Sequence, residues 1–180
     1  TPGPSSISFE SIKNFAPIFG RGDKEYDVIQ NKVIKWLNII SGQDETISLI
    51  GSATCALEIS IANFIRGKVL ALNTGYYSQR LLNIAKNFCE VDILDIEDIT
   101  NVKGQYDWII GCYTETSTAY MLNIEDIKNL KVKTNSKLFL DATGSIGLEA
   151  NHNCADIVAY SSCKGLFGLT GASFISKKLD

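Results

Sequence analysis

One lysine of the sequence, Lys164, comes directly after a strongly apolar run. It stands in the segment 161–165 (Ser-Ser-Cys-Lys-Gly), which follows a β-prone run ending at Tyr160. Lysine side chains normally seek solvent. Burial or a neighbouring cation would lower the lysine pKa, and the neutral amine could then attack a carbonyl group and form a Schiff base. Taken alone, Lys164 is explained more simply as an exposed loop lysine, so its interpretation depends on the rest of the chain.

Small residues at 51–54 (Gly-Ser-Ala-Thr) join a β-prone run to an apolar helical run. Free backbone N–H groups and the helix dipole at such a turn favour an anion, typically phosphate. The hydroxyls of Ser52 and Thr54 would add two donors. The segment matches neither the GxGxxG fingerprint nor the P-loop, and alone it is explained more simply as an ordinary helix N-cap.

Two further polar groups follow predicted strands. Asp141 can be a helix cap, a metal ligand or the partner of a cationic ring nitrogen, and a metal site would need more ligands than His152, the only histidine, supplies. The segment 113–118 (Tyr-Thr-Glu-Thr-Ser-Thr) clusters hydroxyls around one carboxylate. Each signal is weak by itself.

The four segments together indicate one chemistry. An anion-binding turn, a hydroxyl-rich loop, an acid and a strand-end lysine are the parts needed to hold pyridoxal 5'-phosphate. The lysine forms the Schiff base, and the acid keeps the pyridine nitrogen protonated so that the ring can withdraw electrons.

The elements that must position these groups alternate between strand and helix. Strands are predicted at 46–50, 68–72, 91–94, 108–113, 137–140, 157–160 and 172–176, and helices at 23–40, 55–65 and 78–88. The strand runs are nearly continuous Val, Ile and Leu, which is typical of parallel strands covered on both faces. We therefore predict a doubly wound α/β sheet, in which ligands bind beyond the carboxyl ends of the strands.

Composition excludes several classes of protein. The 180 residues carry 17 Lys and Arg against 20 Asp and Glu, a net charge of -3 that argues against a nucleic-acid-coating protein. No apolar run reaches the ~18 residues of a membrane helix. The five cysteines form no CxxC pair, so zinc-finger spacing is absent and a reducing compartment, the cytoplasm, is expected.

Six segments, taken in order, resemble the class V (fold type I) pyridoxal-phosphate-dependent aminotransferases. They are TPGP at 1–4, GSAT at 51–54 with the following Leu57-Glu58, GYYSQR at 75–80, ETST at 115–118, LDA at 140–142 and SSCK at 161–164. Each match is weak, but six in the family's order across the chain make a strong resemblance. It is closest to the members that use 2-aminoethylphosphonate and pyruvate.

The resemblance implies a role for each candidate residue. Lys164 would form the Schiff base and then act as general base and acid, and Asp141 would pair with the pyridine nitrogen. The other implied contacts are Ser52, Ala53, Thr54 and Ser162 at the phosphate, Tyr77 and Thr143 on the two ring faces, Thr116 near the ring hydroxyl, and Gly3 near the substrate. Two positions depart from the family: Ala53 replaces a glycine, and Cys163 replaces Asn or Gln.

The resemblance also implies an architecture, a three-layer αβα fold with a mostly parallel sheet. Residues 1–180 would form the large, cofactor-binding domain, with the family's small C-terminal domain absent from this chain. The resemblance further implies that the chain forms a homodimer, or a complex with a second chain that carries the missing half.

The implied reaction transfers an amino group from a small amine such as 2-aminoethylphosphonate to pyruvate. Two alternatives remain open: an alanine–glyoxylate or serine-type aminotransferase, and a truncated, non-catalytic module that needs a second chain.

The remaining conspicuous residues have structural interpretations. We expect His152 in a surface loop and both Trp36 and Trp108 in the core. Arg80 is expected either in a surface ion pair or near an anion.

Overall fold

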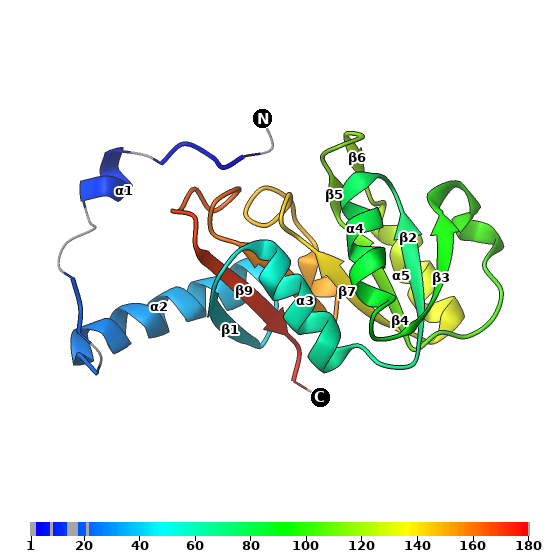
Figure 1. The fold of residues 1–180 in the computed structure, drawn as a ribbon, viewed down its shortest axis with the longest axis horizontal. Coiled ribbons are helices and arrows are strands. Elements are labelled where there is room, and N and C mark those ends of the chain that lie inside the picture. The colour runs from blue at the N-terminus through cyan, green and yellow to red at the C-terminus, as the bar shows by residue number, and fades with distance from the viewer. Residues whose placement is uncertain (1–2, 8, 14–17, 21, 180) are drawn as a thin grey trace.

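A seven-stranded sheet forms the centre of the protein (Figure 1). The computed structural model describes residues 3–7, 9–13, 18–20 and 22–179. Along the chain the strands of this sheet are β1 (Glu45–Ile50), β2 (Lys68–Asn73), β3 (Glu90–Asp95), β4 (Trp108–Cys112), β7 (Lys137–Asp141), β8 (Ile157–Ser161) and β9 (Ala172–Lys177). Their spatial order is β1-β9-β8-β7-β4-β2-β3. Only β9 runs antiparallel to its neighbours, so the carboxyl ends of the other six strands share one edge.

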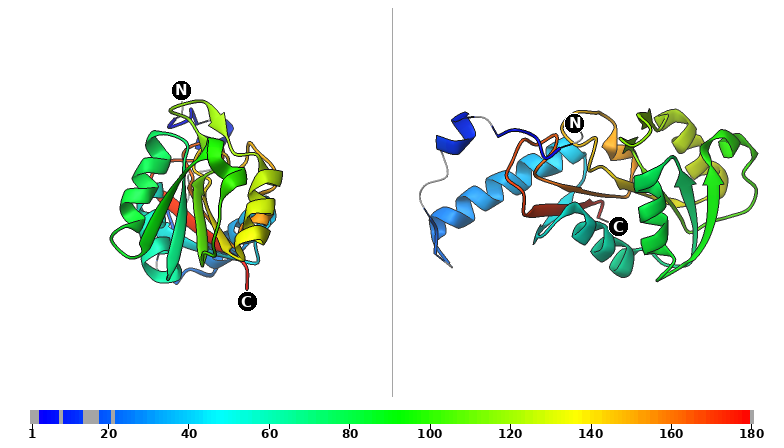
Figure 2. Two further views of the ribbon diagram at one scale, coloured as in Figure 1. Left: turned by 90° about the vertical axis from the view of Figure 1, so that its right-hand side faces the viewer. Right: turned by 45° about the horizontal axis from the view of Figure 1, so that its top comes forward.

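Helices cover both faces of the sheet, as Figure 2 shows. On one face lie α3 (Ala53–Phe64) and α4 (Tyr76–Ala85), and on the other lie α2 (Lys24–Ser41) and α5 (Ile124–Thr134). Strand β2 shows why both faces are apolar: Val69 and Ala71 pack with α3 and α4, whereas Leu70 and Leu72 pack on the opposite face. The predicted αβα architecture with a mostly parallel sheet is therefore confirmed.

The smaller elements lie at the edges of this sandwich. They are α1 (Phe9–Lys13), the short strands β5 (Thr114–Glu115) and β6 (Tyr120–Met121), and the 3-10 turns η1 (Ile96–Asn101) and η2 (His152–Cys154). Within the described ranges, no helix has the length and apolar character needed to cross a membrane.

Helix α5 was absent from the sequence prediction, although its signals are present. Asn123 caps its start, because its side chain accepts a hydrogen bond from the backbone N–H of Glu125 at 3.0 Å. The helix ends at Asn135, which adopts the left-handed conformation at φ 52°. Its buried face consists of only Ile127, Leu130 and Thr134, and this narrow stripe explains why the apolar periodicity is faint.

Two expectations about single residues are wrong. His152 is buried, with 2% of its surface exposed, and its ring packs edge-on against Tyr113 at 5.0 Å between centroids. Trp36 is 56% exposed, because α2 turns Leu37 and Ser41 toward the sheet and the neighbouring indole points away. Trp108 is buried, as expected.

Candidate active site

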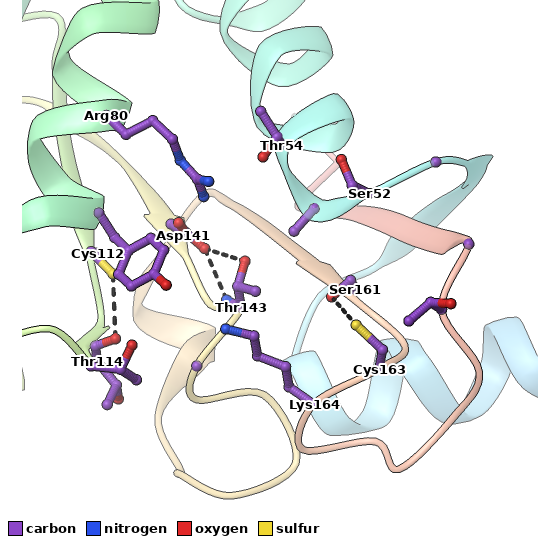
Figure 3. A pocket seen from close by; sticks show the side chains of 17 residues that line it. Ser52, Thr54, Arg80, Cys112, Thr114, Asp141, Thr143, Ser161, Cys163 and Lys164 are labelled. Atoms are coloured by element: carbon purple, nitrogen blue, oxygen red, sulfur yellow. Dashed lines mark hydrogen bonds between the residues drawn. The ribbon is translucent and has the colours of Figure 1, made fainter. Parts of the chain in front are cut away.

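A cavity of about 500 Å³ opens where the carboxyl ends of the parallel strands meet (Figure 3). Its walls come from the turn after β1, the first turns of α3 and α4, the ends of β4, β7 and β8, and the loop before β9. The lining residues are Gly51, Ser52, Ala53, Thr54, Tyr77, Arg80, Cys112, Thr114, Thr116, Asp141, Thr143, Gly144, Ser161, Cys163, Lys164, Thr170 and Gly171. Segments far apart in the sequence thus share one space, as the sheet topology requires.

The start of helix α3 forms one wall of the cavity. Ser52 caps this helix, and its hydroxyl oxygen accepts a hydrogen bond from the backbone N–H of Cys55 at 3.4 Å. The N–H of Gly51 donates to the carbonyl of Gly171 at 2.9 Å, which fixes the turn. The first N–H groups of any helix lack partners inside the helix. Ala53 and Thr54, which line the cavity, carry such N–H groups at the positive end of the helix dipole.

Asp141 ends strand β7 at the base of the cavity. It is 1% exposed, and it accepts hydrogen bonds from both the backbone N–H and the hydroxyl of Thr143. Burial raises the pKa of the Asp141 carboxyl, against the lowering effect of the Thr143 bonds and the positive charges of Arg80 and Lys164. A buried carboxylate of this kind gains most from a cationic partner.

Lys164 lies in the loop between β8 and β9, and its amine points into the cavity (Figure 3). The amine nitrogen lies 5.5 Å from the centre of the Tyr77 ring. Tight packing holds this loop: a Cβ atom added to Gly165 would lie 2.1 Å from the carbonyl oxygen of Ile146. Within the described ranges, no carboxylate forms an ion pair with Lys164.

Helix α4 supplies the wall opposite Lys164. Tyr77 lies in its first turn, and Arg80 follows one turn later with its guanidinium carbon 5.1 Å from the Tyr77 ring centre. Figure 3 shows the guanidinium reaching toward Asp141. The Arg80 Nε atom is buried and has no hydrogen-bond partner. The ion pairs among the described residues do not include Arg80, so the expected surface ion pair is not formed there.

Most of the predicted site residues lie together in this cavity. Those in the lining are Ser52, Ala53, Thr54, Tyr77, Thr116, Asp141, Thr143 and Lys164. Gly3 lies beside it, since a Cβ added there would be 3.1 Å from Cγ of Lys164. Ser162 lies outside the lining, and its hydroxyl is directed to the carbonyl oxygens of Leu169 and Ala172. Thr1 and Pro2 of the TPGP segment fall outside the described residues.

The sequence interpretation assigned no site role to several lining residues. Cys112 and Ser161 each end a buried strand, so the strand-end rule could have found them. Cys112 is largely enclosed, and burial raises the pKa of its thiol well above the ordinary value. Cys163, which stands where the family has Asn or Gln, also lines the cavity, and its Sγ lies 3.6 Å from the Ser161 hydroxyl.

Many of the known proteins that are similar to this chain are aminotransferases. No protein-family profile matches the chain. The 2-aminoethylphosphonate–pyruvate transaminase of Pseudomonas aeruginosa strain UCBPP-PA14 is 27% identical over 97% of this chain and 53% of its own length. The chain thus spans about half the length of the curated relatives it matches.

Solved structures share the fold. The aspartate aminotransferase of Thermus thermophilus superposes with a TM-score of 0.90 at 22% identity, over 98% of this chain and 56% of that one. The pyridoxamine–pyruvate aminotransferase of Mesorhizobium loti gives a TM-score of 0.88 at 20% identity, over 98% and 50%. The resemblance inferred from the six segments is confirmed, and the chain has the fold type I aminotransferase fold.

The residues in the cavity fit pyridoxal 5'-phosphate at its three polar groups. The α3 turn offers N–H and hydroxyl donors suited to a phosphate, and Asp141 is a buried acid suited to a ring nitrogen. Lys164 offers an amine suited to an aldehyde. The volume is that of a small-molecule site. Among the described residues, no group of three His, Cys, Asp or Glu side chains could hold a metal ion instead.

Proposed function

We propose that this chain is the cofactor-binding part of a pyridoxal-phosphate-dependent aminotransferase. The observation that carries the proposal is the placement of Lys164 and Asp141 in one cavity with the α3 turn. A Rossmann-type nucleotide site would also place an anion at a helix start, but the turn after β1 lacks the GxGxxG fingerprint of such a site.

Each residue takes the role that its position suits. Lys164 would hold the cofactor at its aldehyde group, and Asp141 would pair with the protonated ring nitrogen. The α3 turn, through Ser52, Ala53 and Thr54, holds the phosphate. The rest of the proposed contacts are Tyr77 and Thr143 against the ring, Thr116 near the ring hydroxyl, Gly3 toward the substrate and Ser162 as support for the lysine loop.

When bound, the cofactor withdraws electrons from the carbon that carries the amino group and so makes a proton on that carbon acidic. The Lys164 amine, once the substrate amine has taken its place on the cofactor, is the group in the cavity that could accept this proton and return it to the former aldehyde carbon. Asp141, which is buried and hydrogen-bonded to Thr143, keeps its orientation during the exchange. Cys112, which is buried at the end of β4 and lines the cavity, helps to exclude water from it.

For the substrates, we propose a small amine such as 2-aminoethylphosphonate as donor and pyruvate as acceptor, the pair named in the relatives. An alanine–glyoxylate or serine-type reaction is the alternative, and a chain that works only with a second chain is another. We also propose that the protein acts in the cytoplasm as a homodimer or with a chain carrying the remaining half.

Cofactor addition followed by borohydride reduction tests the proposal. The unaltered chain should develop a visible absorption band with pyridoxal 5'-phosphate, and peptide mapping after reduction should find the label on Lys164. Lys164→Ala should lose both signals, whereas Lys86→Ala, at an exposed lysine, should keep them. Adding 2-aminoethylphosphonate should then bleach the band, and pyruvate should restore it. A label spread over surface lysines would refute cofactor binding at this site, and a response to alanine or serine alone would favour the alternative donor.

A further inference from the structure

Glu115 is a fully buried carboxylate that the proposed chemistry does not use. Its exposed fraction is 0%, and it lies next to the cavity without lining it. We propose that Glu115 is a positioning residue that ties the first turn of α4 to the loop 115–118 and so holds Tyr77 and Arg80 in place for the cofactor. The inference rests on the proposed function, since it concerns the binding of the same cofactor.

Backbone and hydroxyl donors surround the carboxylate of Glu115. Its Oε2 accepts a hydrogen bond from the N–H of Ser78, in the first turn of α4, at 2.8 Å. Its Oε1 accepts from the N–H of Ser117 at 3.2 Å and from the Ser117 hydroxyl at 2.5 Å. Burial alone would raise the pKa of the Glu115 carboxyl, but these hydrogen bonds hold it below its ordinary value. The group is therefore an anion at the positive end of α4.

A second set of contacts joins the same two segments. The Ser117 hydroxyl oxygen accepts a hydrogen bond from the N–H of Tyr76 at 3.0 Å, and the Thr118 hydroxyl donates to the carbonyl of Thr74 at 2.9 Å. Gly75 permits this approach. It has φ +155°, and a Cβ there would lie 2.7 Å from the Ser117 hydroxyl and 2.8 Å from Cγ of Glu115.

These hydrogen bonds position Tyr77 because of its place in the chain. It lies between Tyr76 and Ser78, whose N–H groups are bound by Ser117 and Glu115 respectively. In the segment that holds α4, Thr114 and Thr116 are the chain neighbours of Glu115, and both line the cavity. One buried carboxylate thus holds two walls of the cavity at once, and the backbone that carries Tyr77 cannot shift without breaking these hydrogen bonds.

If Glu115 only capped helix α4, its loss would have different measurable effects from the loss of a positioning residue. Loss of such a cap would lower stability but leave the affinity for the cofactor and the surroundings of the bound chromophore unchanged. If Glu115 positions Tyr77, its loss must also weaken binding and change the visible circular dichroism, because that signal depends on the groups arranged around the ring.

The test substitution is Glu115→Gln in the 180-residue chain. The amide has the same shape, but its NH2 group cannot accept a hydrogen bond from the N–H of Ser78 or Ser117. We expect the dissociation constant for pyridoxal 5'-phosphate to rise at least tenfold and the visible circular dichroism of the bound cofactor to change. At saturating cofactor, borohydride should still label Lys164. Glu90→Gln, at an exposed carboxylate at the start of β3, is the matched control and should change neither signal.

The outcomes separate the two proposals. Failure of the unaltered chain to bind the cofactor overturns the proposed function and this inference with it. Normal binding in the unaltered chain with an unchanged dissociation constant in Glu115→Gln overturns the positioning role alone. If Glu115→Gln does not fold, Glu115→Asp replaces it, because the shorter side chain keeps the charge but cannot reach the N–H groups of both Ser78 and Ser117. A folded Glu115→Asp with unaltered affinity and circular dichroism would equally overturn the positioning role.

Discussion

The amine of Lys164 and the guanidinium of Arg80 both lie against the ring of Tyr77, at 5.5 Å and 5.1 Å from its centre. The lysine arrives from the loop after β8 and the arginine from α4. A single aromatic ring therefore sets the spacing between the two cations of the cavity, and each contact lies within the range of a cation–π interaction.

Replacing Tyr77 should weaken the binding of pyridoxal 5'-phosphate. We expect Tyr77→Leu to lose about 1 kcal/mol, or roughly a fivefold rise in the dissociation constant, because stacking on an electron-poor ring is lost. Tyr77→Phe keeps the ring and should bind within about twofold of the unaltered chain. Absorbance titration measures both constants. Equal binding by Tyr77→Leu and the unaltered chain would argue against contact between this ring and the cofactor.

Packing behind Lys164 leads to a second prediction. In Gly165→Ala the new methyl group would meet the Ile146 carbonyl oxygen at 2.1 Å, so the lysine loop must move. We expect a loss of about 1–3 kcal/mol in the free energy of unfolding and a lower yield of borohydride label on Lys164.

Gly104→Ala is the control for this change. No atom lies within 4 Å of a Cβ added there, so only its φ of +101° imposes a cost. That cost should be about 1–2 kcal/mol, with no change in the labelling of Lys164. Equal labelling of both variants would mean that the position of the loop does not control the reactivity of the amine.

The buried side chain of His152 should make the free energy of unfolding depend on pH. Burial lowers the pKa of His152 from its ordinary 6.5 to about 4. Between these values the unfolded chain binds a proton that the folded chain does not, so the stability present above pH 6.5 is lost as the pH falls toward 4. The loss amounts to about 3 kcal/mol at most. Urea unfolding of the chain and of His152→Gln at pH 7 and pH 5 measures it. The difference in unfolding free energy should shrink at the lower pH, and a constant difference would show that His152 titrates normally.

The sequence could predict the fold and most of the cavity because both follow from local patterns. Strands β4, β7 and β8 are apolar on both faces, and in a parallel sheet their carboxyl ends must meet. This geometry brings Asp141 near Lys164 without any knowledge of long-range contacts. His152 could not be placed in the same way. Its loop is polar in sequence, and only tertiary packing against Tyr113 and the Ser145 hydroxyl, 2.9 Å from Nε2, buries it.

For a related reason the sequence assigns no specific role to Glu115 and leaves Arg80 between a surface ion pair and a place near an anion. Glu115 was recognised only as part of a motif, since its partners Ser78 and Ser117 lie in different elements. Arg80 follows Tyr77 by three positions, a spacing that puts both on one face of a helix. That spacing could have indicated a place in the site, but a surface arginine on α4 would show the same pattern.

The charge of Arg80 should control the pH at which the cofactor binds. Burial raises the pKa of Asp141, and the nearby guanidinium lowers it, so without that charge the carboxyl gains its proton at a higher pH. A protonated Asp141 cannot stabilise a protonated ring nitrogen, and affinity that requires the carboxylate is lost as the pH falls. We therefore expect the affinity of Arg80→Met for the cofactor to fall at a higher pH than the affinity of the unaltered chain.

Arg80→Lys keeps a positive charge on α4 and should follow the pH profile of the unaltered chain more closely. The cofactor phosphate also titrates, with a second pKa of about 6, and Arg80→Lys controls for this contribution because it keeps a positive charge at the same position. Dissociation constants for pyridoxal 5'-phosphate at several pH values provide the measurement. Parallel profiles for Arg80→Met and Arg80→Lys would show that the guanidinium does not act through Asp141. A uniform loss of affinity in Arg80→Met would instead place its charge at the phosphate.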